Sequence, residues 1–187
     1  MPAPDRLYFT EDDEANRLIA SEPFALLVGF ALDQQVTVPT AFTGPLKLKR
    51  RLGTLDPKRI AATDPGRLEE AFREKPAVHR FPGSMAARVH DLAATIAEDY
   101  GGHAERIWAE AGDGTELRAR LAALPGFGEM KIKSLGAVLA NRYGVAAAEP
   151  LVPGHPTLGD VDSPQALADY QAAKRAHKAS MRAAKPS

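Results

Sequence analysis

The sequence predicts an all-α protein, and three observations favour this fold class. Apolar residues recur at helical spacing in long segments, as Met85, Val89 and Leu92 do. Several segments open with a capping residue followed by proline, as at Asp56-Pro57. No two runs of alternating apolar residues flank a hairpin turn, which a sheet would require.

The amino-terminal part of the chain divides into five predicted helices. We expect Thr10 to cap the first helix and Ser21 to cap the second. The second segment is apolar almost all round, as a central buried helix should be. A Gly44-Pro45 pair predicts a kink or joint in the third. The five segments are 10–20, 21–35, 39–53, 56–63 and 64–74.

The remainder of the chain predicts four more helices and one long connection. The helices are expected over 83–102, 115–123, 128–143 and 164–181, while the glycines and prolines of 145–163 predict an irregular segment. These boundaries predict a single domain over residues 1–187. Its helical bundle would span about 22–143, including a hairpin at 115–143, and its second lobe would combine 1–21 with 145–187.

Composition excludes several classes of site. The 187 residues include no cysteine, which excludes disulfides, thiolate metal sites and an iron–sulfur cluster. The histidines are not grouped at the spacing of metal ligands, so we expect neither a metal nor another cofactor. The start of the chain has no signal-peptide core, and the apolar run 23–32 is too short to span a bilayer. We therefore expect a cytoplasmic monomer with no membrane partner.

The charges cancel over the whole chain but are unevenly distributed. The net charge is zero, residues 11–14 are acidic, and 47–51 and 174–185 are basic. Local patches of this kind bind phosphate even when the total charge is zero. A solvated helix face is the simpler interpretation of each patch taken alone.

The stretch "LPGFGEMK" at 124–131 places two glycines between two predicted helices. Gly126 and Gly128 allow positive φ angles and let another backbone approach closely. They also leave the amides at the start of the next helix accessible, which creates a phosphate site that Lys131 and Lys133 would reinforce. A plain helical hairpin is the alternative, but the pattern is typical of a helix–hairpin–helix motif, which holds a nucleic-acid backbone without reading its sequence.

A second stretch, "LLVGFALDQQVTVPTAF" at 26–42, resembles the glutamine-bearing segment of the helix–hairpin–helix DNA glycosylase superfamily. Together with 76–108 and the hairpin, it is similar to a small bacterial base-excision-repair branch of that superfamily, over about residues 7–181. The resemblance implies a two-lobed, DNA glycosylase-like helical fold that binds double-stranded DNA. Gln34 and Gln35 match the wedge that fills the hole left by a flipped-out nucleotide.

Two further residues follow the glutamine segment at a distance in the sequence. His79 and Arg80 are candidates to contact phosphate or to line a pocket, with buried structural hydrogen bonds as the equal alternative. For the glutamine pair itself, a helix end with solvated side chains is the simpler interpretation when the pair is considered alone.

The chain departs from the pattern of that family at its catalytic positions. Family members carry a catalytic aspartate shortly after the hairpin, in a context that is missing here. A carboxylate would stabilise the positive charge that develops on the sugar, and Asp160 is the leading candidate, with Glu149 as the alternative. A turn or capping aspartate is the other interpretation of Asp160. Bifunctional members carry a Schiff-base lysine where this chain has Met130. Lys131 is one residue later, about 100° around the helix, so strand cleavage is not expected.

Together these features predict a monofunctional DNA N-glycosylase of base excision repair, which excises damaged or mispaired bases. The alternative is a non-catalytic DNA-binding or lesion-sensing protein on the same scaffold. A carboxylate within reach of a flipped sugar distinguishes the two. The lesion itself depends on pocket residues from scattered positions and does not follow from the sequence.

Overall fold

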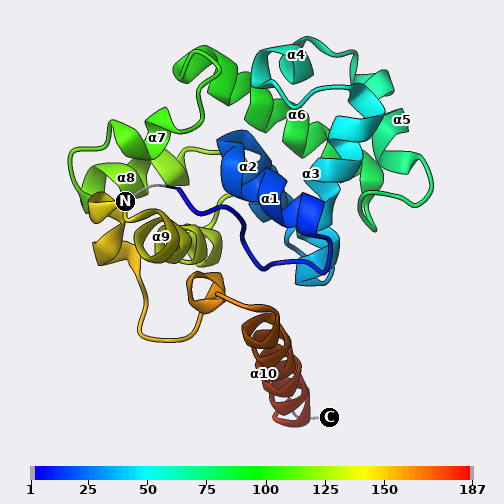
Figure 1. Ribbon diagram of the computed structural model, residues 1–187. Coiled ribbons are helices and arrows are strands. Elements are labelled where there is room, and N and C mark those ends of the chain that lie inside the picture. Colours follow the sequence, from blue (N-terminus) through cyan, green and yellow to red (C-terminus); the bar gives the residue numbers. More distant parts are fainter. Residues whose placement is uncertain (1–2, 186–187) are drawn as a thin grey trace.

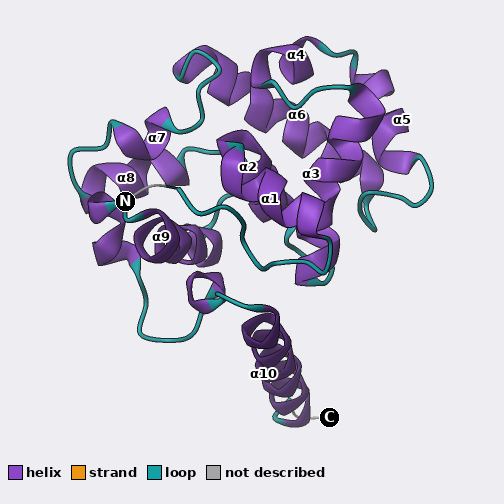
Figure 2. Cartoon of the chain, viewed as in Figure 1, coloured by secondary structure: helices purple, strands orange, loops and turns teal. Residues whose placement is uncertain are grey.

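The computed structural model describes residues 3–185 as a helical protein, and no strand occurs in that range (Figures 1 and 2). The predicted fold class is therefore confirmed. The helices follow one another around a central pair, and the last one projects from the rest (Figure 1). They are α1 (Asp13–Ser21), α2 (Pro23–Leu32), α3 (Val38–Leu52), α4 (Pro57–Ala62), α5 (Pro65–Arg73), α6 (Pro82–Asp99), α7 (Arg106–Ala109), α8 (Gly114–Ala122), α9 (Glu129–Tyr143) and α10 (Pro164–Ala183), with short 3-10 helices η1 (Ala146–Leu151) and η2 (Leu158–Asp160) before the last.

Helix α2 forms the centre of the core, as its apolar sequence predicts. Every residue from Phe24 to Leu32 is buried, and the helix packs against α1, α3 and α6. Gly29 allows the close approach of α3, because a Cβ atom there would lie 2.3 Å from the ring of Phe42. Phe42 in turn makes edge-to-face contacts with Phe9 at 4.9 Å and Phe30 at 5.1 Å between ring centroids. Packing of this kind fixes where the carboxyl end of α2 lies.

Two predicted helix caps are wrong, for local reasons. Thr10 bonds through its hydroxyl to the Asp12 carbonyl and to Asn16, so Asp12 caps α1 instead and accepts from the Ala15 amide. Ser21 is the last residue of α1, and Glu22 precedes α2 without a side-chain cap bond. The proline inside α3 does not end that helix, which runs on from Val38 to Leu52.

The segment predicted as irregular, 145–163, contains η1 and η2 and packs closely on α9. A Cβ atom on Gly159 would lie 2.6 Å from the backbone of Ala137, so η2 lies directly against α9. The Asn141 side chain also donates to the Gly159 carbonyl at 3.3 Å. The connection therefore follows α9 and leads to the start of α10.

Within residues 3–185, no single helix has both the length and the apolar character needed to cross a membrane, although α1 and α2 meet that criterion as a pair bent by 115°.

Candidate nucleic-acid interface

Helices α8 and α9 form the predicted hairpin, joined by a turn at 123–128. Leu124 and Phe127 in the turn are buried between the two helices, and the Phe127 amide donates to the Leu124 carbonyl at 3.2 Å. Apolar anchors on both sides of Gly126 hold the turn in one conformation. The turn is therefore held by two buried apolar side chains and one backbone hydrogen bond.

The two glycines of the turn have different roles, which corrects part of the prediction. Gly126 has a φ of 79°, the left-handed region that favours glycine. A Cβ atom there would lie 2.7 Å from the side chain of Arg88, so the close neighbour is a side chain rather than a backbone. Gly128 has a φ of −88°, which any residue adopts, and nothing lies within 4 Å of a Cβ at that position. The prediction of positive φ is confirmed for Gly126 and wrong for Gly128.

Gly128 is the N-cap of α9 and leaves the end of that helix open. No side chain caps the helix, and the first amides of a helix have no acceptor within it. These donors and the helix dipole favour an anion at the open position. The acidic Glu129 in the first turn pairs with Arg118 at 2.6 Å and with Lys133 at 3.8 Å. Its negative charge is therefore compensated locally, and Lys133 forms part of that compensation.

The glutamine loop (residues 33–37) connects α2 to α3. Hydrogen bonds from the buried side chain of His79 hold it in place. The His79 side chain is 2 % exposed, and its Nε2 lies 3.0 Å from the carbonyl oxygens of both Leu32 and Gln34. Its Nδ1 accepts from the Phe81 amide at 2.9 Å, so the hydrogen is on Nε2 and is donated to these carbonyls. Both ring nitrogens are thus engaged inside the protein. His79 has the structural role that was its alternative, and it is not placed to contact phosphate.

The two glutamines point in different directions. The Gln34 side-chain oxygen accepts from Arg88 of α6 at 2.8 Å and lies 3.5 Å from the Lys131 amine of α9. Gln35 is exposed and has a φ of 57°, the one non-glycine positive φ among the described residues. A left-handed conformation at a non-glycine residue costs free energy and persists where its surroundings impose it. The loop therefore turns Gln34 inward and Gln35 outward.

Lys131 connects the hairpin to the glutamine loop. Its amine donates to the Ala31 carbonyl at 3.1 Å, at the carboxyl end of α2, where the helix dipole favours a cation. Met130, one position earlier, is 73 % exposed. Lys131 lies one residue after the position that the resemblance assigns to a Schiff-base lysine. This one-residue difference turns the Lys131 side chain into the body of the protein.

The charges of Arg88 and Asp33 act on this amine. The pKa of Lys131 is lowered to about 8, mainly because the amine is buried; the positive charge of Arg88 also lowers it, and the negative charge of Asp33 partly opposes the shift. Burial raises the pKa of the Asp33 carboxyl, against the opposing charges of Lys174 and Lys131. Tyr170 of α10 has a raised pKa because it is buried and because Asp33 and Asp160 both act on it. The hairpin, the glutamine loop and α10 therefore share one cluster of ionisable groups.

This cluster predicts an unusual titration of Lys131. Its amine should lose its proton near pH 8, whereas an exposed lysine does so near pH 10.4. Asp33→Asn should lower that midpoint, because it removes the negative charge that favours the ammonium form. Competitive amine labelling with mass spectrometry from pH 6 to 11 measures the midpoint directly. Asp56→Asn, at the start of the distant α4, serves as the control, and an unchanged midpoint in Asp33→Asn would contradict the assigned neighbourhood.

The predicted catalytic carboxylates lie in different parts of the fold. Asp160 ends η2, is exposed, and uses Oδ2 to accept from the Thr157 amide at 2.9 Å. Its charge raises the pKa of Tyr170, as the charge of Asp33 does. Glu149 is exposed in η1, which packs against α8 and α9 near Gly114. Asp160, unlike Glu149, therefore acts on Tyr170 together with Asp33 of the glutamine loop.

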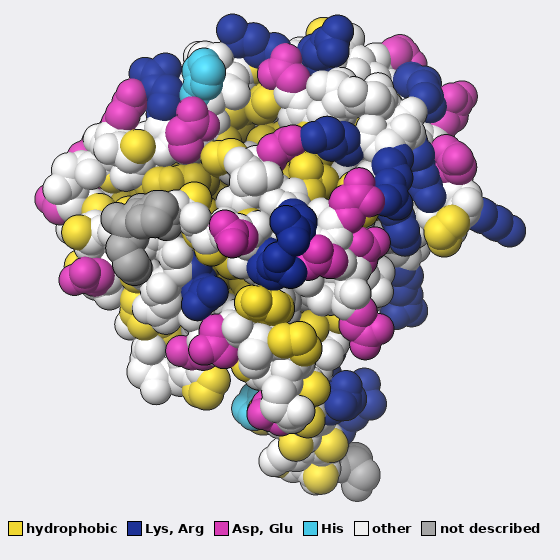
Figure 3. Space-filling view, viewed as in Figure 1, with side chains coloured by type: hydrophobic (Ala, Val, Ile, Leu, Met, Phe, Trp, Pro, Cys, Tyr) yellow, Lys and Arg dark blue, Asp and Glu magenta, His cyan; other side chains and the backbone are white. Residues whose placement is uncertain are grey.

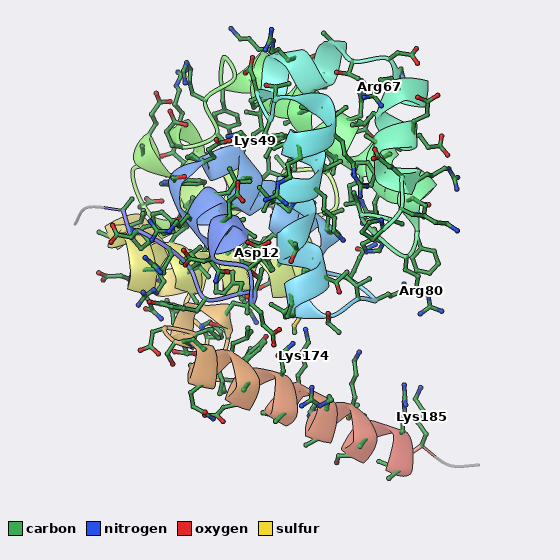
Figure 4. All side chains as sticks on the ribbon, turned by 45° about the vertical axis from the view of Figure 1, so that its right-hand side comes forward. Asp12, Lys49, Arg67, Arg80, Lys174 and Lys185 are labelled. Atoms are coloured by element: carbon green, nitrogen blue, oxygen red, sulfur yellow. The ribbon has the colours of Figure 1, made fainter. Side chains whose placement is uncertain are left out.

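A groove of about 440 Å³ separates α10 from the glutamine loop. Figure 4 shows Lys174 rising from α10 toward the body, with Arg80 across the open space. Four basic side chains and no acidic one line the groove, which we call the α10 groove. Its lining residues are Gln35, Val36, Thr37, Val38, Arg80, Gln171, Lys174, Arg175 and Lys178.

The side chains of the other predicted basic patch form ion pairs and hydrogen bonds within the protein. In 47–51, Lys49 pairs with Glu22, Arg50 pairs with Glu14, and Arg51 donates to the Ala71 and Pro76 carbonyls. Figure 3 shows basic and acidic side chains interspersed over this face of the body. Lys49, Arg50 and Arg51 are therefore engaged within the protein, unlike the basic residues that line the groove.

Sequence reasoning missed Arg88, Asp33 and Tyr170. Arg88 lies on α6 and touches both the Gly126 turn and Gln34, residues 38 and 54 positions away along the chain. In the sequence, only the lysine after the hairpin and the polar residues beside "QQ" indicated that this site exists. Within the part of the chain that the structure describes, no group of three or more His, Asp or Glu side chains forms a metal site.

Comparison with protein families identifies the scaffold. The model of the HhH-GPD superfamily base excision DNA repair protein matches residues 28–184, which include α3 to α9, the hairpin and α10. Neither the curated proteins nor the solved structures contain a match to the chain. The family match covers well over half of the sequence and includes the hairpin and most of the glutamine-bearing stretch whose geometry is given above. The chain therefore belongs to the HhH-GPD superfamily of base excision DNA repair proteins.

Proposed function

We propose that the protein is a monofunctional DNA N-glycosylase that excises damaged or mispaired bases from double-stranded DNA and acts as a monomer. One observation carries the proposal. Lys131 of the hairpin bonds to the Ala31 carbonyl at the end of α2 and lies 3.5 Å from the side-chain oxygen of Gln34, so the hairpin and the glutamine loop lie side by side. An enzyme that holds the backbone and extrudes one nucleotide needs this combination.

Gln35 is the residue we assign as the wedge. Its outward side chain lines the α10 groove, whereas Gln34 is held inward by Arg88. A glutamine amide donates and accepts hydrogen bonds, which suits the edge of an unpaired partner base. Gln34 would then position the loop rather than contact the DNA.

Asp160 is the carboxylate we assign to the chemistry. Cleavage breaks the C1′–N bond, the electron pair leaves with the base, and positive charge develops on the sugar. Oδ2 of Asp160 is held by the Thr157 amide, while no hydrogen bond within the described residues engages Oδ1. A carboxylate fixed in this way would stabilise the cation electrostatically until a water oxygen bonds to C1′, and the proton that the water loses neutralises the departed base.

A panel of single-lesion duplexes tests the proposal. Purified protein is incubated with each duplex, and hot alkali then converts abasic sites into strand breaks. We expect breaks after alkali for at least one lesion and intact strands without it. Binding to damaged duplex with no base release from any lesion would instead favour the non-catalytic lesion-sensing alternative.

Borohydride trapping on a duplex with an abasic site checks the monofunctional assignment. We expect no covalent adduct with the wild type, because the Lys131 amine is turned into the body of the protein and bonded to the Ala31 carbonyl. An adduct that disappears in Lys131→Ala would instead establish an enzyme that also cleaves the strand.

A further inference from the structure

Helix α10 carries a basic stripe on the side that faces the groove. Gln171, Lys174, Arg175 and Lys178 all line the groove and recur at helical spacing. Arg182 continues the same stripe four residues later. None of the three basic groove residues on α10 forms an ion pair within 4 Å in the described part of the chain. The carboxylate of Asp33 acts on Lys174 only from a greater distance.

The way α10 is attached leaves this stripe accessible. Of its twenty residues, Leu167 alone is buried, and the carboxyl end of the helix projects from the body (Figures 1 and 4). Twenty residues of helix extend about 30 Å. A long exposed helix with four basic residues and one acidic residue contributes little to the core, so its stripe is available to a ligand.

The occupant that fits is a chain of phosphates. From Lys174 to Arg182 the stripe extends about 12 Å along the helix axis. One DNA strand presents a phosphate about every 3.4 Å of its axis, so several phosphates fall within that length. Arg80 adds a positive charge from the wall opposite α10, and the exposed Gln35 lines that same side of the groove. No acidic side chain lines the groove to repel such a ligand.

We propose that α10 is an electrostatic arm that holds the backbone of a DNA strand across the groove from Gln35. The proposal rests on the proposed function for the identity of the polyanion as DNA. The hairpin would hold one stretch of backbone and the arm another, so that the glutamine loop meets the duplex between two fixed points. Backbone contacts of this kind set register without reading sequence.

Salt dependence of binding tests the arm. The affinity for an undamaged duplex is measured by fluorescence anisotropy over a salt series, for the wild type and for Lys174→Gln/Lys178→Gln. We expect the slope of log K against log salt to fall by about 1.8, because each lost phosphate contact contributes about 0.9. Affinity at 0.1 M salt should fall by more than about tenfold.

A charge-matched control separates the arm from a general loss of positive charge. Lys58→Gln/Arg59→Gln removes two exposed cations from α4, which lies on the opposite side of the molecule from α10 (Figure 1). Equal slopes in the two double variants would overturn the arm, and so would tighter binding of a double-stranded RNA of the same length. Base release is assayed separately. If the wild type binds DNA and releases no base, the glycosylase assignment fails, while a selective slope change in the α10 variant still supports the arm.

Discussion

Replacing Asp160 with asparagine is expected to slow base release by about a hundredfold to a thousandfold. That range is typical of removing one preorganised electrostatic group from an active site. The fold should be retained, because an asparagine side-chain oxygen can still accept from the Thr157 amide that Asp160 now caps. DNA affinity should be retained or slightly raised, since a negative charge near phosphate is removed. Single-turnover release from the preferred lesion measures the effect apart from product dissociation.

Two variants at other carboxylates serve as matched controls for Asp160→Asn. Asp162→Asn changes an exposed carboxylate two residues away, and Glu149→Gln changes the exposed carboxylate of η1. Neither should slow base release appreciably. Full activity in Asp160→Asn would refute its role and direct attention to Asp33, which also acts on Tyr170 from within the cluster.

The sequence predicted the helices well where local signals define their ends. Asp64 caps α5 through its carboxylate, and the apolar character of α2 predicted its burial. The errors occurred where a nearby side chain competes for the same role. Asp12 rather than Thr10 caps α1, because the Thr10 hydroxyl is already bonded to Asn16. The 3-10 helices of the connection depend on packing against α9, a tertiary effect that no local pattern contains.

The candidate site was predicted only as far as its motifs extend. The hairpin and the glutamine pair carry recognisable sequence patterns, and the structure places the two segments next to each other. The direction of each glutamine depends on Arg88, on the buried His79 and on a positive φ at Gln35. These contacts join residues about 45 to 54 positions apart, and periodicity does not report on them. The inward turn of Lys131 follows likewise from its bond to the end of α2, 100 residues earlier.

Gly128→Asp is expected to weaken DNA binding by about tenfold or more for every sequence tested, without loss of fold. Gly128 occupies the open N-cap of α9, where its amide neighbours favour an anion. An aspartate at this position places its own carboxylate where a phosphate oxygen would bind, and its charge repels the backbone. Aspartate is also a preferred N-cap residue, so α9 should gain a few tenths of a kcal/mol in stability. Stability and binding are thus predicted to change in opposite directions.

Gly128→Asn provides the matched control for this result. Asparagine caps a helix about as well as aspartate and has nearly the same shape, but it carries no charge. The space at Gly128 accommodates either side chain, since nothing lies within 4 Å of a Cβ there. Duplex binding by anisotropy and thermal unfolding are measured for both variants in the same buffer. A carboxylate-specific loss of affinity, with both proteins at least as stable as the wild type, assigns the phosphate to the end of α9. Equal affinity in Gly128→Asp and Gly128→Asn would show that the DNA backbone does not meet the hairpin at this position, because the added charge would then have nothing to repel.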